Sequence, residues 1–426
     1  MRTWSGGAGP LAPAPSQAVP EVSDAYLAAR RAATDWLTHH HSALLADPAG
    51  QERAVAEAIA QALAETGAPA DLARRLRTDL WAAVLGAGPL QPYLEDPLVT
   101  EITVTGTMVW VERAGRFHKE PDLPSPEVAF RVAEDLAAKV GRRFQQAHPR
   151  VDLTWPDGSR VNLVHPALCP KGAVITIRKR NQGLALELGD LVRLGVLTAE
   201  MAGLLVAAVR GRLNVLLSGS TGAGKTTNLR ALANAALTDP AERVITLEDT
   251  EELRLVHPHT VPLVSTQGQG NELTVTLHDL FVNALRMRPD RIIVGEVRSV
   301  EALDMLEAGM SEHGGMLTTM HLEAPERFGP RLFWLAQRAG WDVSLESITR
   351  EAYQVFGLVA HVDKFADGTR RVTRISEPDG TGMRDLWRWD PEAGRHVAVG
   401  ELSPARVRKI LDNGGGWPPA PWEVAP

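Results

Sequence analysis

The alternation of apolar and polar positions changes its period several times along the chain. From residue 23 to about residue 85, Ala, Leu, Glu and Arg recur at helical spacing, and breaks at 47–50 and 66–69 predict about three helices. Beyond residue 86, the segments 101–105 and 109–112 alternate as half-buried strands do. We therefore predict a helical region over 23–85 and a small α+β domain over 86–182, with a helix near 125–140 and further strands near 160–164 and 173–178.

The second half of the chain has a different pattern. After a linker expected over 183–195, apolar strands alternate with helices over 196–376, which is typical of an α/β fold with a mostly parallel sheet. The stretch 377–426 predicts a C-terminal hairpin, a short helix and a Gly/Pro-rich end. Residues 1–22 are rich in Gly, Ala and Pro and predict a disordered tail.

A phosphate-binding loop is the strongest chemical signal in the sequence. The segment 219–227 matches G-x-x-x-x-G-K-[ST], follows an apolar run at 213–217 and precedes a stretch that favours helix. In such a loop, backbone N–H groups turn onto phosphate oxygens and the helix N-terminus adds partial positive charge. Lys225 is expected to reach the β- and γ-phosphates, and Thr226 to ligate Mg²⁺. The predicted nucleotide-binding residues are Gly219, Ser220, Thr221, Gly222, Ala223, Gly224, Lys225, Thr226 and Thr227.

Three further apolar runs of this half end in chemically useful groups, namely Glu248, Glu296 and His321. Ligands of open parallel sheets lie at the carboxyl ends of the strands, so we expect these groups to converge on the P-loop. Glu296 is the candidate for polarising the attacking water and for acting on Mg²⁺, directly or through water. Glu248 is a candidate for orienting that water or holding the Mg²⁺ shell, and His321 for sensing the γ-phosphate.

Each of these groups also has a structural interpretation. Glu248 stands in an acidic run, 248–252, that would complement the dipole at a helix N-terminus. Glu296 and Arg298 would form a surface ion pair, and His321 would be an ordinary satisfied histidine. Sequence spacing alone leaves both interpretations open.

Arginines are the usual means of stabilising charge on a transferred phosphoryl group. The α+β domain offers Arg160 and Arg178, which we take as catalytic candidates. Arg180 of the same domain and three arginines beside the strand that precedes Glu296 are weaker candidates, because solvated basic faces are common. Those three are Arg286, Arg288 and Arg291.

Composition narrows the class of protein. Of 426 residues, 44% are hydrophobic and 23% charged, as in ordinary globular proteins, and the net charge of −7 argues against a generally basic nucleic-acid coat. The single cysteine, Cys169, excludes an intramolecular disulfide and suits a reducing compartment. Apolar runs such as 201–209 are about half of the roughly 20 residues that a spanning helix needs. We expect a cytoplasmic protein that reaches the inner face of a membrane only through partners.

The chain resembles the traffic ATPases of type II and type IV secretion, and within them the CpaF-like branch that serves tight-adherence (Tad) pili. The resemblance rests on the P-loop, on the acidic segment 243–253 and on 285–298, which is similar to the family's Walker B region. Segments 88–92, 96–102 and 157–162 resemble the family's N-terminal domain. The resemblance to the family covers roughly residues 80–375.

This resemblance implies a homohexamer of subunits, each with a mobile N-terminal domain and a RecA-like core that bind ATP and Mg²⁺ between them. Glu248 would be the acid of the family's Asp box, Glu296 the catalytic glutamate and His321 a histidine of the His box. Arg160 and Arg178 would close on the γ-phosphate. Domain closure would drive an inner-membrane platform protein, with no direct contact to nucleic acid.

One departure from the family's pattern concerns turnover. In the His box, which contains His313, Glu312 stands where the family has glycine. A side chain there restricts the backbone and adds negative charge. We therefore weigh two other functions against the pilus motor. One is a nucleotide-gated scaffold with little turnover, and the other is the ATPase of a conjugative type IV secretion system. A small-molecule kinase would need an acceptor-binding insertion and an arginine-bearing lid, and the sequence has neither.

Overall fold

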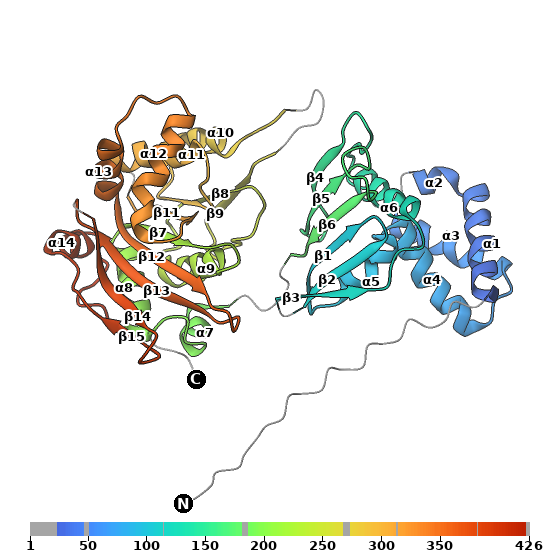
Figure 1. The fold of residues 1–426 in the computed structure, drawn as a ribbon, viewed down its shortest axis with the longest axis horizontal. Helices are drawn as coiled ribbons and strands as arrows, with labels where there is room; N and C mark the ends of the chain where they lie inside the picture. Colours follow the sequence, from blue (N-terminus) through green and yellow to red (C-terminus); the bar gives the residue numbers. More distant parts are fainter. Residues whose placement is uncertain are drawn as a thin grey trace, which may run out of the picture.

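The computed structural model describes residues 24–46, 51–113, 115–180, 186–266, 273–311, 314–380 and 382–422. The predicted disordered tail over 1–22, the predicted break at 47–50, Glu312 and His313 lie outside these ranges. Figure 1 shows a helical region, an α+β part and a larger α/β part, with the α+β sheet lying between the other two. No helix within the described ranges is both long and apolar enough to cross a membrane.

The described residues of the helical region form four helices, where the sequence predicted about three. They are α1 (Asp24–His40), α2 (Ser42–Ala46), α3 (Glu52–Glu65) and α4 (Ala70–Val84). The difference is α2, a five-residue helix too short to show a period of its own. The longer helices bury a shared apolar stripe that includes Leu37, Ile59 and Leu76.

The α+β part is built on a six-stranded antiparallel sheet in the order β3-β2-β1-β6-β5-β4. Its elements are a 3-10 turn (Gly88–Leu90), α5 (Gln91–Glu95), β1 (Val99–Thr105), β2 (Met108–Arg113), β3 (Arg116–Glu120), α6 (Pro126–Ala138), β4 (Arg150–Thr154), β5 (Arg160–Val164) and β6 (Val174–Arg178). One face of the sheet is apolar and packs against α6. Ile102 and Ile177 belong to this face. Arg160 and Arg178 are cross-strand partners and occupy alternate positions on the strands, so both lie on the other face of the sheet.

The α/β part contains a nine-stranded sheet in the order β15-β14-β13-β12-β7-β11-β10-β8-β9. The six strands from β12 to β9 are parallel, whereas β13, β14 and β15 are antiparallel. Its elements are α7 (Leu188–Arg193), α8 (Ala199–Arg210), β7 (Asn214–Gly219), α9 (Lys225–Ala236), β8 (Val244–Glu248), β9 (Thr260–Val264), α10 (Leu277–Ala284), a 3-10 turn (Leu285–Met287), β10 (Arg291–Val294), α11 (Glu301–Met310), β11 (Leu317–His321), a 3-10 turn (Pro325–Arg327), α12 (Phe328–Arg338), α13 (Leu345–Val355), β12 (Phe356–Lys364), β13 (Arg370–Pro378), β14 (Met383–Asp390), β15 (Arg395–Ala398) and α14 (Pro404–Asp412).

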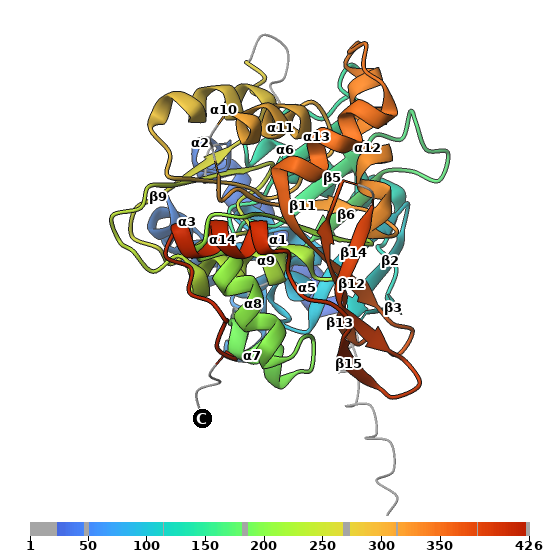
Figure 2. The same cartoon turned by 90° about the vertical axis from the view of Figure 1, so that its left-hand side faces the viewer.

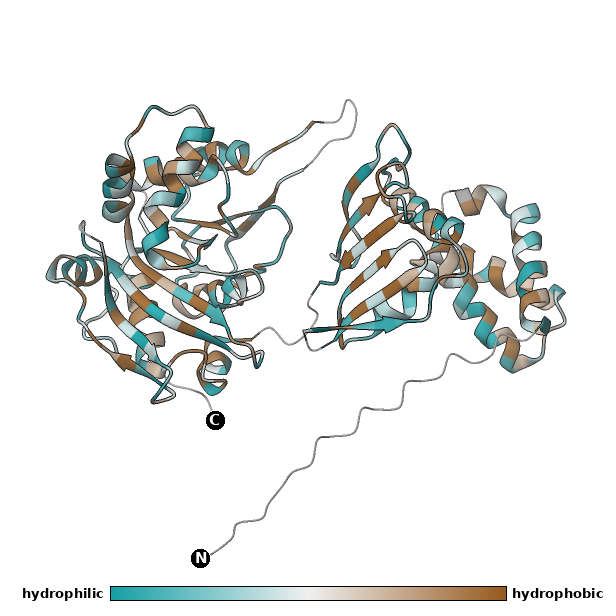
Figure 3. Cartoon of the chain, in the orientation of Figure 1, coloured by the Kyte–Doolittle hydropathy of each residue, from teal (hydrophilic) through white to brown (hydrophobic). Residues whose placement is uncertain are grey.

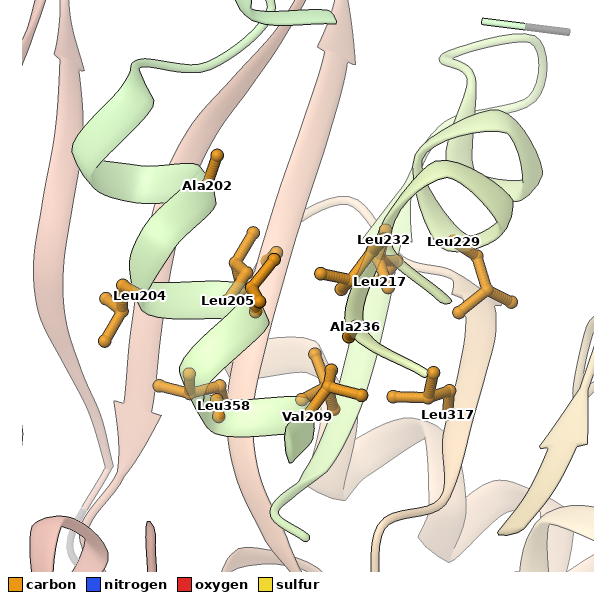
Figure 4. Close-up of a cluster of buried hydrophobic side chains, with 14 of the residues drawn as sticks. Ala202, Leu204, Leu205, Val209, Leu217, Leu229, Leu232, Ala236, Leu317 and Leu358 are labelled. Atoms are coloured by element: carbon orange, nitrogen blue, oxygen red, sulfur yellow. The ribbon is translucent and has the colours of Figure 1, made fainter. Parts of the chain in front are cut away.

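Helices cover both faces of this sheet, which explains why its central strands are apolar throughout. Every residue of β7 is buried, as expected of a parallel strand between two helical layers. On one face, Leu205 and Val209 of α8 and Leu232 of α9 pack with Leu217 of β7 (Figure 4). The opposite face packs against α10 to α13. Figure 3 shows the resulting hydrophobic strands within polar surroundings.

The C-terminal residues fold back onto α8. The predicted hairpin is present as β14 and β15, with Trp387 opposite Ala398, and Figure 2 shows α14 beside α8. Residues 413–422 follow α14 and close on the start of α8, where the backbone N–H of Trp422 donates to Ala199 at 2.8 Å. Gly203 makes this approach possible, because a Cβ there would lie 2.1 Å from the carbonyl oxygen of Ala420.

Candidate functional site

The P-loop lies between β7 and α9, in the strand–loop–helix context that its sequence predicted. Gly222 and Gly224 have φ of +74° and +95°, in the left-handed region that favours glycine. A Cβ at Gly219 would lie 2.1 Å from the carbonyl oxygen of Val362 on β12. The loop therefore has no side chain at these three glycine positions, so phosphate oxygens can approach its backbone N–H groups.

Lys225 begins α9, and its ammonium group is drawn into the loop. The side chain is buried, and Nζ donates to the carbonyl oxygens of Gly219 at 3.2 Å and Ser220 at 3.0 Å. Burial lowers the pKa of Lys225, the charge of Glu296 opposes that shift, and the charge of Arg178 adds to it. No carboxylate contacts Nζ directly among the described residues, so its charge is available to an anion in the loop.

His321 connects Lys225 to Glu296. The Nδ1 atom of His321 lies 3.0 Å from Nζ of Lys225, and its Nε2 lies 3.1 Å from Oε1 of Glu296. Because an ammonium group only donates, Nδ1 must accept and Nε2 must carry the proton. Burial and the charge of Lys225 lower the pKa of His321, whereas Glu296 raises it. The ends of β10 and β11 thus meet at the P-loop, as their positions in a parallel sheet predicted.

Glu248, at the end of β8, faces its own following loop. It is 4% exposed, and its Oε1 accepts from the backbone N–H groups of Glu252 and Leu253, both at 3.0 Å. Burial raises the pKa of Glu248 to about 7, although the two backbone hydrogen bonds oppose that rise. The alternative that residues 248–252 begin a helix is wrong, because 251–257 contain no helix. Glu248 instead fixes the conformation of an irregular loop.

The other acid of this segment, Asp249, is the ion-pair partner of Arg298. Arg298 forms an ion pair with Asp249, which also accepts from the hydroxyl of Ser265 at 2.7 Å. The alternative of a Glu296–Arg298 surface pair is therefore not what the structure contains. Arg298 ties the loop after β10 to the loop after β8, and Glu296 is left to His321.

Arg160 approaches the loop after β8 from the α+β part. Its Nη2 lies 3.0 Å from Oε1 of Glu252, and Glu252 also gives its backbone N–H to Glu248. The Nε of Arg160 is buried and has no hydrogen-bond partner among the described atoms. Arg178, on the neighbouring strand, is exposed and contributes its charge to the surroundings of Lys225. Both predicted arginines therefore lie on the side of the α+β sheet that faces the P-loop.

The weaker arginine candidates lie elsewhere or have structural roles. Arg180 donates to the carbonyl oxygen of Asp157 at 3.2 Å. Arg291 is buried and forms an ion pair with Glu242 at 3.0 Å. Arg286 and Arg288 are exposed.

Two contacts of the P-loop were not predicted from the sequence. Arg370, the first residue of β13, donates from Nε to the carbonyl oxygen of Gly222 at 2.9 Å. Ser218, the residue before the loop, hydrogen bonds to Nδ1 of the buried His361 at 2.9 Å. The available signals were the basic pair 370–371 after an Asp-Gly turn and a histidine within an apolar strand, and neither is specific.

Comparison with known proteins supplies the family. Residues 84–348 match the family model described as "Type II/IV secretion system protein". The chain belongs to this family. It is 34% identical over 318 residues to the putative conjugal transfer protein Rv3659c of Mycobacterium tuberculosis, covering 71% of this chain and 86% of that protein. It is 32% identical over 342 residues to the type IV secretion system protein VirB11 of Brucella suis, covering 73% and 91%.

Solved structures of similar proteins include the VirB11 ATPase from the Brucella suis type IV secretion system. That chain is 30% identical with a TM-score of 0.36, covering 67% of this chain and 91% of that one. The Legionella pneumophila ATPase DotB is 21% identical with a TM-score of 0.48, covering 67% and 79%. The nine-stranded sheet confirms the predicted α/β fold class, and the family model and the relatives confirm the predicted type II/IV secretion family. The CpaF-like branch stays a prediction.

Proposed function

We propose that this family member is a cytoplasmic, Mg²⁺-dependent motor that works as a homohexamer and drives an inner-membrane platform protein of a pilus or secretion system. The observation that carries the proposal is the chain of contacts from Lys225 through His321 to Glu296 beside the P-loop. These contacts bring a cation, an imidazole and a carboxylate together at one edge of the sheet; ATP hydrolysis uses a cation at the phosphates and a group that orients the attacking water, which supports the proposal.

The residues of this edge fit a nucleotide. The P-loop has a bare backbone at Gly219 and left-handed glycines at Gly222 and Gly224. Lys225 would neutralise phosphate oxygens, and Thr226, the second residue of α9, would ligate Mg²⁺. The metal ion would supply charge neutralisation at the phosphates. Residues 219–227 as a set remain the proposed nucleotide-binding segment.

Catalytic roles follow from where each group lies. Glu296 is the proposed acceptor for the proton of the attacking water, and His321 holds its carboxylate in place through Nε2. The short distance from His321 to Lys225 makes the imidazole a sensor of whether the ammonium is engaged by phosphate. Glu248 orders the loop 249–253 at this edge of the sheet through its hydrogen bonds to Glu252 and Leu253. We also propose that it contacts the water molecules bound to Mg²⁺.

Coupling between the two parts of the molecule is proposed to run through Arg160. Its ion pair with Glu252 joins the α+β sheet to the loop that Glu248 orders. When phosphate occupies the P-loop, Arg160 would exchange this contact for the nucleotide, Arg178 would approach the same charge, and the α+β part would be pulled inward. That displacement is the proposed mechanical output.

The pilus system that we propose is of the CpaF-like, tight-adherence type. The P-loop, the acidic segment 243–253 and the segment 285–298 support this assignment by their similarity to that branch. A second candidate is the ATPase of a conjugative type IV secretion system. The names of two relatives, a putative conjugal transfer protein and VirB11, favour it. The two candidates share the same chemistry and differ in the platform protein.

The test is steady-state ATP hydrolysis by the purified full chain with Mg²⁺, with its mass measured with and without a non-hydrolysable analogue. We expect Lys225→Ala to abolish binding and Glu296→Gln to keep binding while lowering turnover at least about 100-fold. Glu323→Gln, at an exposed acid two residues beyond His321, is the matched control and should behave as wild type.

Different outcomes separate the proposals. Turnover lost in both variants, with a hexamer-sized species, supports the motor and shows that Glu312 is tolerated. Tight ATP binding without turnover, unchanged by Glu296→Gln, would contradict the enzyme and leave the nucleotide-gated scaffold.

A further inference from the structure

The hairpin of β12 and β13 brings a basic residue onto the P-loop. Strand β12 pairs in parallel with β7, with Val362 opposite Gly219, so the hairpin end extends beyond the same edge of the sheet as the loop. Arg370 donates from Nε to the carbonyl oxygen of Gly222 at 2.9 Å. Its Cδ lies 3.3 Å from the position that a Cβ on Gly224 would take. The guanidinium therefore lies against the middle of the P-loop.

Most of the guanidinium of Arg370 is uncommitted. The residue is exposed, and no carboxylate pairs with it within the described part of the chain. Its partner in the β12–β13 ladder is Lys364, another exposed cation. Arg374, four residues further along β13, shows the contrast, because it binds both Glu326 and Asp385. The N–H groups and the flat face of the Arg370 guanidinium that Gly222 does not occupy are therefore available to a ligand beside the P-loop.

The strand order indicates which end of a nucleotide would lie there. Strand β7 has β11 on one side and β12 on the other. The groups placed to act on a terminal phosphate, His321 and Glu296, come from β11 and from the end of β10, which lies beyond β11. A nucleotide whose terminal phosphate lies at these groups extends along the P-loop toward the β12 side. Its nucleoside end then lies near Arg370.

We propose that Arg370 binds the nucleoside monophosphate end of the nucleotide, which would make it a binding residue on the opposite side of the P-loop from the catalytic groups. A guanidinium can stack on the flat face of the base, a contact at this end that a free phosphate chain cannot supply. The inference rests on the proposed nucleotide site and adds a contact to it. The competing interpretation is that Arg370 only braces the loop through Gly222.

Binding measurements on the full chain distinguish these interpretations. The probes are MgADP and Mg-tripolyphosphate, which share a phosphate chain but differ in the nucleoside end, and the readout is the Kd from titration calorimetry. We expect Arg370→Ala to weaken MgADP about 10-fold, as for one lost stacking contact between a cation and an aromatic ring, and to change tripolyphosphate less than twofold. Arg370→Lys should keep part of the MgADP affinity. Arg395→Ala, at an exposed arginine of β15, is the control and should match wild type.

Equal weakening of both probes in Arg370→Ala would overturn the proposal and show a brace of the P-loop, and unchanged MgADP affinity would overturn it as well. A steady-state measurement gives a second test, because loss of a contact outside the reacting phosphate raises KM and leaves kcat within about twofold. An equal fall of kcat and kcat/KM would contradict it. Absence of nucleotide binding by the wild-type chain would instead overturn the proposed function, so the two failures are distinguishable.

Discussion

Glu248 permits a quantitative prediction about stability. Its pKa is raised from 4.5 to about 7 because the carboxyl group is 4% exposed, so the folded chain favours the protonated acid. At about 1.4 kcal/mol per pH unit, the rise corresponds to about 3 kcal/mol. This contribution to the free energy of unfolding is fully present below pH 4.5 and is lost as the pH rises through about 7.

The perturbation is Glu248→Gln, which resembles the protonated acid in shape and leaves an oxygen to accept from the N–H groups of Glu252 and Leu253. The variant cannot ionise. We expect its stability relative to wild type to increase by about 2.5 kcal/mol between pH 5 and pH 8.5, because part of the contribution is already lost at pH 5. The assay is urea denaturation followed by tryptophan fluorescence at several pH values, without nucleotide or Mg²⁺.

The matched control is Glu301→Gln. Glu301 is equally buried and accepts from the backbone N–H groups of Arg298 and Ser299 at 2.6 and 2.7 Å, next to the start of α11. Loss of its charge at a helix N-terminus should destabilise the fold at pH 8.5. If Glu248→Gln follows wild type in parallel at every pH, the argument that burial protonates Glu248 is refuted.

Two further predictions concern packing and a surface pair. Gly203→Val should displace residues 413–422 from α8, because its Cβ would lie 2.1 Å from the carbonyl oxygen of Ala420. We expect the free energy of unfolding to fall by about 1–3 kcal/mol and proteolysis of the C-terminus to become faster. Unchanged proteolysis would contradict the packing of residues 413–422 on α8. His278 lies 2.7 Å from Asp304, which raises the pKa of His278. His278→Ala should therefore cost less than about 1 kcal/mol at pH 5.5, since the side chain of His278 is 45% exposed, and nothing at pH 9. A loss of equal size at pH 9 in urea denaturation would contradict an ionic origin.

Predictions from sequence succeeded where the signal was local or periodic. The strand before residue 219 and the helix after residue 225 are fixed by an apolar run, glycines and helix-forming residues that are contiguous in the chain. The meeting of His321 and Glu296 followed from a general property of parallel sheets, that strand ends share an edge. The antiparallel hairpin of β14 and β15 followed from two alternating runs.

Side-chain direction could not be predicted in the same way. Glu248 ends a strand just as His321 does, yet its carboxylate turns to the N–H groups of Glu252 and Leu253, a choice set by the fold of an irregular loop. Arg370 reaches the P-loop only because β13 folds back beside β12, a contact across 148 positions of sequence. Such contacts depend on three-dimensional packing and leave no periodic trace.

The position of Arg160 opposite Arg178 has a consequence for how the site responds to its surroundings. The two residues are joined through neighbouring strands of one hydrogen-bonded ladder, and a sheet of this kind resists relative sliding of its strands. Any rotation of the α+β part relative to the P-loop therefore carries both positive charges together. Any movement that changes the electrostatic field of Arg178 at Lys225 therefore also changes the ion pair of Arg160 with Glu252, so the two contacts with the α/β part respond together.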